Sequence, residues 1–281
     1  MRITLSPQDY AAAFRILSAN DRHHMNLAEL LEDRVAPNLP AMPSLLDVGA
    51  GSGKVARELA PRFPSMTLIE PNRDQLGSFE LEGVEVIHRP FEDFTSEATY
   101  DLVLCSHVLH HVPLEAWESF IDRLLSFVRP EGTCVITMTA NRGQLYEMTR
   151  KFTSPAIVGR LVMELLSRKG IAFEVAGKIN PIITDSFEEM HALCRFFVLE
   201  NCHTAERLSA LSEAEAREIV EEIQRRAEGC RTASGTYQLD EEEDMILIRP
   251  APRLKAQGRP AGAHLSASGR IPSSPTAPSA S

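Results

Sequence analysis

The stretch LLDVGAGSGKV at residues 45–55 decides the fold of this chain. It predicts a buried strand, a turn with glycine at positions 49, 51 and 53, and a helix over about residues 54–62. Glycine permits positive φ and lets a ligand approach the backbone, and the free N–H groups of the helix start lie at the same point. The Gly-x-Gly-x-Gly spacing is not the Gly-x-Gly-x-x-Gly of dinucleotide-binding folds, and an ordinary strand–helix corner is the alternative interpretation.

Three more strand candidates follow, and each ends on polar residues. Residues 66–69 end on Glu70, which comes 23 residues after Asp47. This is close to the roughly 20-residue offset at which an acid binds a ribose in nucleotide-binding βαβ units. The other two candidates are residues 84–87 and residues 100–105. The polar segments after them are Phe91-Glu92-Asp93 and Ser106-His107, the latter followed by His110 and His111.

Taken in order, these motifs resemble the class I S-adenosylmethionine-dependent methyltransferases. The matching pieces are DVGAGSG (47–53), IEP (69–71), FED (91–93) and YDLVLCSHVLHHV (100–112), within residues 44–140. The resemblance implies an α/β fold with a doubly wound, mostly parallel Rossmann-like sheet of about seven strands. It also implies an enzyme with S-adenosylmethionine as cofactor. In such sheets ligands bind beyond the carboxyl ends of the strands, where all four motifs are expected.

The resemblance assigns the cofactor contacts residue by residue. Asp47 would help to hold the ammonium group and Glu70 would accept hydrogen bonds from both ribose hydroxyls. Phe91 would contact the adenine face, and Glu92 or Asp93 its exocyclic amine. The full expected set is Asp47, Gly49, Gly51, Gly53, Glu70, Pro71, Phe91, Glu92, Asp93 and Ser106.

A narrower resemblance, to the histamine N-methyltransferase-like group, adds TANRGQLYEM (139–148) and EEEDMILI (241–248). It implies that the N-terminal helices and residues 141–211 cover the substrate. Tryptophans expected in the helical stretch are replaced by Gln144 and Met148, so the acceptor implied is a small amine or imidazole compound other than histamine. His107 would contact substrate and transfer a proton. The implied substrate contacts are Tyr10, Phe14, His107, His110, His111 and Glu241.

The rest of the chain divides by composition. Residues 1–40 predict an N-terminal helical cap, which either packs on the core or forms a lid. Residues 41–250 predict the methyltransferase domain, with a helical substrate-cap insertion at about 141–211. Residues 251–281 hold Pro, Ala, Ser and Gly with hardly an apolar anchor, so a disordered tail is expected.

Charge and cysteine content limit the function classes. The net charge of −10 argues against a nucleic-acid partner and fits a small-molecule acceptor. Five cysteines without a CxxC pair indicate a reduced, cytoplasmic protein without disulfides. No metal site is expected, because the spacing of the three histidines 107, 110 and 111 lacks a clear fourth ligand. No apolar run reaches about 18 residues, so no membrane span is expected, and the oligomeric state stays open.

Several alternatives remain open. His111 is more often a packing residue than a ligand, and the acidic run Asp240–Asp244 is more often a solvated loop or edge than part of a pocket. The acceptor atom is a nitrogen in the favoured interpretation and an oxygen in the alternative. A regulatory protein that binds the cofactor without turnover is the third possibility.

Overall fold

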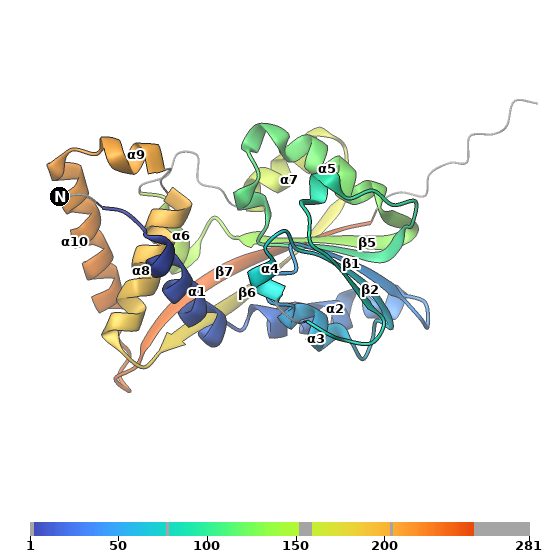
Figure 1. The fold of residues 1–281 in the computed structure, drawn as a ribbon, viewed down its shortest axis with the longest axis horizontal. Coiled ribbons are helices and arrows are strands. Elements are labelled where there is room, and N and C mark those ends of the chain that lie inside the picture. The colour runs from blue at the N-terminus through green and yellow to red at the C-terminus, as the bar shows by residue number, and fades with distance from the viewer. Residues whose placement is uncertain (1–2, 77–78, 152–158, 203–204, 250–281) are drawn as a thin grey trace, which may run out of the picture.

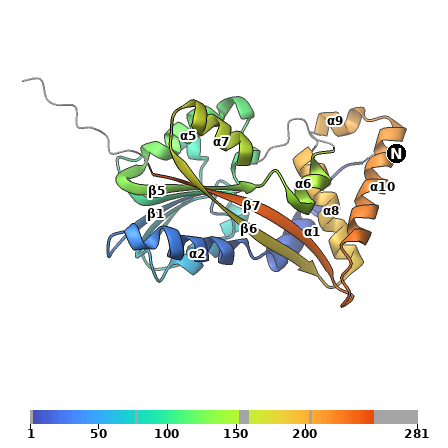
Figure 2. The same cartoon turned by 180° about the vertical axis from the view of Figure 1, so that it is seen from behind.

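The computed structural model describes residues 3–76, 79–151, 159–202 and 205–249 (Figures 1 and 2). The predicted tail lies outside the described residues. The core is one sheet of seven strands in the order β3-β2-β1-β4-β5-β7-β6. Strands β1 to β5 pair in parallel, whereas β7 runs antiparallel to both β5 and β6. This confirms the expected doubly wound, largely parallel sheet. The strands are Ser44–Val48 (β1), Ser65–Ile69 (β2), Val84–Ile87 (β3), Tyr100–Ser106 (β4), Val128–Thr139 (β5), Phe173–Thr184 (β6) and Tyr237–Ile248 (β7).

Helices cover both faces of the sheet. Helices α5 (Trp117–Ser126) and α7 (Gly159–Arg168) pack on one face, through a core that includes Trp117 and Ile121. Helices α2 (His23–Arg34) and α3 (Lys54–Leu59) pack on the other, through Leu27 and Leu31. Connections of this kind between parallel strands place the carboxyl ends of β1 to β5 at one edge.

Strands β6 and β7 extend past that edge and carry a separate helical cap (Figures 1 and 2). The cap has its own apolar core, in which Phe196, Phe197 and Leu193 pack with residues of the neighbouring helices. Its helices are α1 (Pro7–Asn20), α6 (Gly143–Thr149), α8 (Phe187–Cys202), α9 (Ala205–Ala210) and α10 (Glu213–Gly229). The short helix α4 (Arg73–Leu76) lies beside the parallel strands.

Capping residues fix where two of the cap helices begin. Ser6 caps α1, and its side chain and that of Asp9 form reciprocal hydrogen bonds with the backbone. Ser212 and Glu215 form the same capping box at the start of α10, as the sequence predicts. Such a cap stabilises a helix by about 1 kcal/mol.

The length of β7 corrects one expectation from the sequence. The acidic run Asp240–Asp244 is not a solvated loop, because it lies inside the 12-residue strand β7. Glu241 is 6 % exposed, Glu243 0 % and Asp244 1 %. Buried carboxylates need hydrogen-bond partners or counter-charges, so this run has to be built into a polar site.

Within the described residues, none of the helices combines the length and apolar character needed to span a membrane.

We expect Gly83→Ala to destabilise the fold. Gly83 precedes β3 with a φ of +76°, and a Cβ there would clash with the backbone carbonyl oxygen of Pro64. A left-handed backbone at a non-glycine residue costs roughly 1–2 kcal/mol, and the clash adds about as much again. Urea denaturation should therefore show a loss of about 2–4 kcal/mol in the free energy of unfolding.

Gly235→Ala is the matched control, because Gly235 has a φ of +92° and no atom within 4 Å of the added Cβ. Its free energy of unfolding should fall only by the cost of the left-handed backbone, roughly 1–2 kcal/mol. Equal losses in the two variants would contradict the close packing of Gly83 on Pro64.

Candidate active site

A cavity of about 330 Å³ lies at the carboxyl ends of β1 and β4, between the glycine turn and the helical cap. Its floor is the turn of residues 49–52, and its far side is formed by α1, α8 and β7. This is the position at which open α/β sheets bind their ligands. The cavity therefore joins the predicted cofactor turn to the predicted substrate cap.

One side of the cavity is an aromatic wall, formed by Tyr10, Phe14 and Phe196. The rings of Tyr10 and Phe14 are stacked with centroids 6.2 Å apart, and Phe196 meets Tyr10 edge-on at 5.3 Å. The structure thus brings both predicted aromatic residues to the cavity. Phe196, on α8, adds a third ring that was not predicted from the sequence.

Glycine is required at the three positions of the turn for different structural reasons. All adopt left-handed backbone, with φ of 76° at Gly49, 55° at Gly51 and 73° at Gly53. A Cβ at Gly49 would clash with Val108, and one at Gly53 would clash with Phe79. A Cβ at Gly51 would meet no protein atom within 4 Å. Only at Gly51 does the missing side chain leave open space in the cavity.

Glu70 holds this turn in place by hydrogen bonds to its backbone. Its carboxylate accepts hydrogen bonds from the backbone N–H of Gly51 at 3.0 Å and from that of Asn72 at 2.8 Å. Asp47, at the end of β1, lines the cavity and is 2 % exposed. Burial, together with the charge of Glu70, raises the pKa of Asp47 to about 7. An ionised Asp47 is therefore favoured by a cation beside it.

The residues predicted to bind adenine lie apart from the cavity. Phe91 is buried in the core, with ring centroids 5.0 Å from Phe120 and 5.9 Å from Phe127. Its ring packs inside the protein, which corrects its assignment as an adenine contact. Pro71, Glu92 and Asp93 are exposed, and Glu70 also lies outside the cavity lining. Their proposed cofactor roles stay predictions.

His107 follows β4 in an unusual backbone conformation. Its φ of 52° is the one positive value at a non-glycine residue in the described chain. Its backbone N–H donates to Thr137 at 3.0 Å, and its Nε2 donates to Glu243 at 2.8 Å. Burial lowers the pKa of His107, but the hydrogen bond to Glu243 and the charges of Glu241, Glu243 and Asp21 together raise it to about 9. His107 is therefore an imidazolium at neutral pH.

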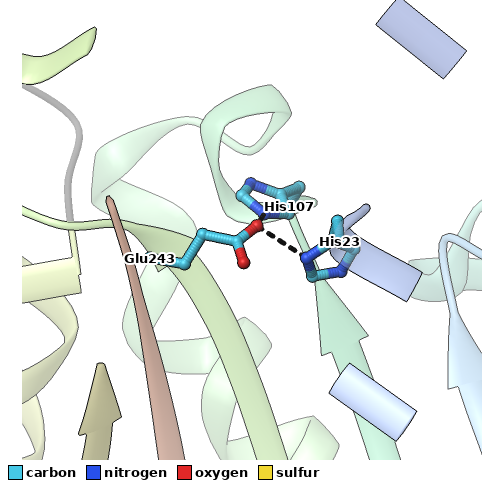
Figure 3. Close-up of side chains that lie close together, drawn as sticks. All are labelled: His23, His107 and Glu243. Carbon is cyan, nitrogen blue, oxygen red and sulfur yellow. Dashed lines mark hydrogen bonds and ion pairs between the residues drawn. The ribbon is translucent and has the colours of Figure 1, made fainter. Parts of the chain in front are cut away.

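Glu243 also binds a second histidine, from the N-terminal helix α2. The Nδ1 of His23 lies 2.6 Å from the same carboxylate oxygen, Oε1, so both rings converge on one atom (Figure 3). The Nε2 of His23 lies 2.6 Å from the hydroxyl of Ser106. Burial opposes ionisation of Glu243, but the two histidines lower the pKa of this carboxyl group well below its usual range.

Alternation along β7 divides the acidic run between two faces. Glu242 and Asp244 point to one side, where both pair with Arg142 at 2.7 and 2.9 Å. Glu241 and Glu243 point to the other side, where Glu241 lines the cavity. Glu241 accepts hydrogen bonds from Thr139 at 2.8 Å and from Asn180 at 3.3 Å, and both of these donors are neutral.

The remaining predicted substrate residues, His110 and His111, lie at the cavity with ring centroids 4.0 Å apart. Burial and the charges of the neighbouring histidines lower the pKa of His110 well below its usual value, so its ring is neutral. His111 is exposed, which corrects the interpretation of it as a packing residue.

Sequence reasoning missed His23 and Glu243, which are 220 positions apart. A signal for Glu243 was present in the sequence. If Glu241 faces a pocket from a strand, the residue two positions later faces it too. No comparable signal marked His23, because its partner depends on how α2 packs against β7.

The donor atoms of His23, His107 and Glu243 lie within 4.8 Å of one another, the only such group found in the described part of the chain. Two donors bound to one tetrahedral metal at about 2.1 Å lie roughly 3.4 Å apart. The observed nitrogen–oxygen distances of 2.6 and 2.8 Å are shorter and match N–H···O hydrogen bonds. The spacing therefore fits hydrogen bonds between these side chains rather than ligands of a metal ion.

Comparison with known proteins identifies the family. A family model described as "Methyltransferase domain" matches residues 21–175, which is more than half of the chain. The chain belongs to this family. The match includes β1 to β5, the glycine turn and also α2 with His23.

Curated relatives match this methyltransferase over a shorter segment. The ubiquinone biosynthesis O-methyltransferase of Rickettsia felis is 34 % identical over 104 residues, 35 % of this chain and 41 % of that protein. The enzyme of the same name from Aeromonas salmonicida is 31 % identical over 106 residues, 35 % of this chain and 43 % of that protein. The match thus spans about two-fifths of the length of these relatives.

Solved structures agree on the fold. A Bacillus halodurans protein described as a methyltransferase superposes with a TM-score of 0.53 at 16 % identity, covering 81 % of this chain and all of that one. The YcgJ protein of Bacillus subtilis gives 0.52 at 14 %, covering 80 % and 98 %. At these identities the likeness concerns the fold alone.

Membership of the methyltransferase family makes S-adenosylmethionine the cofactor of this chain. The structure offers two features that fit it. The open space at Gly51 would let the cofactor lie against the backbone, and the buried carboxyl group of Asp47 lines the same cavity, where it would hold the ammonium group. When bound, the cofactor supplies an activated methyl group on a sulfonium.

We expect Gly51→Val to block cofactor binding while leaving the protein folded. The new side chain would fill the open space at the turn, so the dissociation constant for S-adenosylmethionine should rise at least tenfold in calorimetric titration. Gly170→Val is the control, because Gly170 also has positive φ and no atom within 4 Å of an added Cβ. Both variants should lose roughly 1–2 kcal/mol of stability. Wild-type affinity in Gly51→Val would refute the role of the turn.

We expect cofactor affinity to increase with pH between 6 and 7.5. Because the pKa of Asp47 is raised to about 7, its carboxyl group is mostly protonated at pH 6. Ionisation between pH 6 and 7.5 creates the charge that attracts the ammonium group, so binding should strengthen several-fold. Titration with S-adenosylhomocysteine, which carries the same ammonium group, measures this.

Asp47→Asn should bind more weakly and show no such pH dependence. The same raised pKa means that the ionised carboxylate disfavours the folded state. Without ligand, the contribution of Asp47 to stability should therefore fall as pH rises from about 4 through 7. Equal wild-type affinity at the two pH values would contradict the placement of Asp47.

Proposed function

We propose that this protein transfers the methyl group of S-adenosylmethionine to a nitrogen atom of a small amine or imidazole compound bound in the cavity. The observation that carries the proposal is Glu241. Its side chain lines the cavity, is 6 % exposed and forms no salt bridge with any described residue. Burial raises the pKa of Glu241, so a cationic group beside it would stabilise the ionised form.

The cavity also fits the rest of such an acceptor. The aromatic wall of Tyr10, Phe14 and Phe196 can hold a cation by its ring faces or an apolar body by contact. Asn180 adds an amide beside Glu241. An acceptor with a cationic end and an apolar or aromatic body therefore matches both sides of the cavity.

Methyl transfer to such an acceptor is a displacement in which alignment matters most. Holding both reactants in one cavity supplies several kcal/mol through proximity alone. Glu241 and the aromatic wall would orient the acceptor, and the glycine turn would orient the donor. An amine that binds as a cation must also lose a proton before its lone pair can attack.

A second candidate function is methylation of a hydroxyl group. It is supported by the names of the curated relatives, which are O-methyltransferases. Those relatives match only 35 % of this chain, so their acceptor chemistry is a weaker guide than the cavity itself. Glu241 has no evident use in binding a neutral phenol.

We expect Glu241→Gln to raise the KM for a cationic acceptor about tenfold, with little change in cofactor affinity. The amide is nearly isosteric and keeps most of the hydrogen bonding to Thr139 and Asn180, so the lost charge is what is measured. Steady-state kinetics require an acceptor first, found by screening pooled amines, imidazoles and phenols for S-adenosylhomocysteine formation.

Glu242→Gln is the matched control for this variant. Glu242 is the next residue on β7 but faces away from the cavity and pairs with Arg142. Its KM should stay at the wild-type value. If phenols were the only acceptors and Glu241→Gln had no effect, methylation of oxygen would replace the proposal. Cofactor binding without turnover of any acceptor would instead favour a regulatory protein.

A further inference from the structure

Three side chains from three separate elements form a hydrogen-bonded chain beside the cavity. The hydroxyl of Ser106, at the end of β4, lies 2.6 Å from Nε2 of His23 on α2. The Nδ1 of the same ring lies 2.6 Å from Oε1 of Glu243 on β7. In Figure 3 both rings point at the same carboxylate oxygen, and His23 meets His107 edge-on with ring centroids 4.7 Å apart.

The chemistry of the partners assigns the protons in this chain. An ionised carboxylate only accepts hydrogen bonds, so Nδ1 of His23 must carry a proton and donate it to Glu243. A neutral ring protonated on Nδ1 has its lone pair on Nε2, and that lone pair accepts the hydroxyl hydrogen of Ser106.

The position of this lone pair matters for methyl transfer. His23 and Ser106 both line the cavity, together with the glycine turn and Glu241. The hydroxyl of Ser106 lies within hydrogen-bond distance of Nε2. An N–H or O–H group of a bound acceptor can take the place of that hydroxyl with the same geometry.

We propose that His23 is the base that takes the proton from the methyl acceptor, with Glu243 and Ser106 as positioning residues. The proposal rests on methyl transfer occurring in this cavity, but it holds for a nitrogen or an oxygen acceptor. Glu243 fixes the tautomer of the ring, and Ser106 occupies the lone pair until the acceptor displaces it.

The step balances in atoms and charge. The acceptor atom forms a bond to the methyl carbon, while the bond from that carbon to sulfur breaks and its electron pair stays on sulfur as a neutral thioether. The proton of the acceptor goes to Nε2 of His23, which becomes an imidazolium beside Glu243. Release of this proton to water restores the neutral ring.

His107 cannot perform the same step at neutral pH. Its Nε2 carries the proton that is donated to Glu243, and the ring is already cationic. Its role in this arrangement is to hold Glu243 in place. The charged and titratable groups around His23 are Glu243, Glu241, His107, Asp21 and His24.

The first test needs no acceptor. A long-range proton–nitrogen NMR spectrum of protein labelled with ¹⁵N-histidine, recorded at pH 7.5, reports which ring nitrogens carry protons. The His23 signals are assigned by their loss in His23→Ala. We expect a neutral ring with the proton on Nδ1 and none on Nε2. A proton on Nε2 of His23 would overturn the proposal.

The second test uses the acceptor found by screening. His23→Ala should lower kcat on the order of 100-fold, which is typical for loss of a general base, and leave the dissociation constant for S-adenosylmethionine within twofold. Added imidazole should restore part of the activity by entering the vacated space. The fall of kcat at low pH in the wild type should disappear in the variant.

Met25→Ala is the control for damage to α2, because Met25 lies on the same helix and is 54 % exposed. It should keep wild-type kcat. Unchanged kcat in His23→Ala would overturn the proposal, as would one equivalent of a transition metal in the purified protein that is lost in His23→Ala. If no acceptor is methylated although the NMR result is as expected, the proposed function fails and the proton assignment of His23 stands.

Discussion

The two hydrogen bonds to Oε1 of Glu243 are the interaction on which the site depends. They join α2, the end of β4 and β7, three elements that are distant in the chain. Glu243 is fully buried, and a buried carboxylate that loses its partner costs roughly 3–5 kcal/mol. The left-handed backbone of His107 is a smaller cost, about 1–2 kcal/mol, that places its ring against this carboxylate. Pairing this charge therefore fixes where the N-terminal helices meet the sheet.

The same constraint explains the acidic sequence of β7. A strand presents alternate residues to opposite faces, so four consecutive acids form two pairs rather than one cluster. Arg142 pairs with both Glu242 and Asp244 on one face. On the other face, His107 and His23 both bind Oε1 of Glu243, whereas the hydrogen bonds of Glu241 come from the neutral side chains of Thr139 and Asn180. One strand thus carries a face paired with Arg142 and an opposite face that carries Glu241 and Glu243.

The sequence predicted the fold well because its signals are local. The glycine turn, the acid at Glu70 and the strand–helix alternation each depend on neighbouring residues, and the sheet followed from them. Gly51, Asp47 and the aromatic residue Tyr10 line the cavity, and their binding roles stay predictions. Phe91 packs in the core instead, because a ring after a strand can turn into the core as easily as toward a ligand. His23 and Glu243 could not be paired, since their contact exists only once β7 extends past the parallel strands and α2 packs beside it.

Two carboxylates of the site, Glu241 and Glu243, lie outside the part of the chain that the family model matches. Curated relatives share only about a third of this chain, whereas β7 lies beyond the region that the family model matches. The carboxylates Glu241 and Glu243 are therefore contributed from outside the shared part, and they act on residues inside it. A proton taken up by His23 would add a positive charge beside Glu243 and Glu241, in a cavity that would then hold a neutral thioether instead of a sulfonium. The positive charge lost from sulfur would reappear on the ring a short distance away, so the total charge in the cavity would stay the same during the transfer.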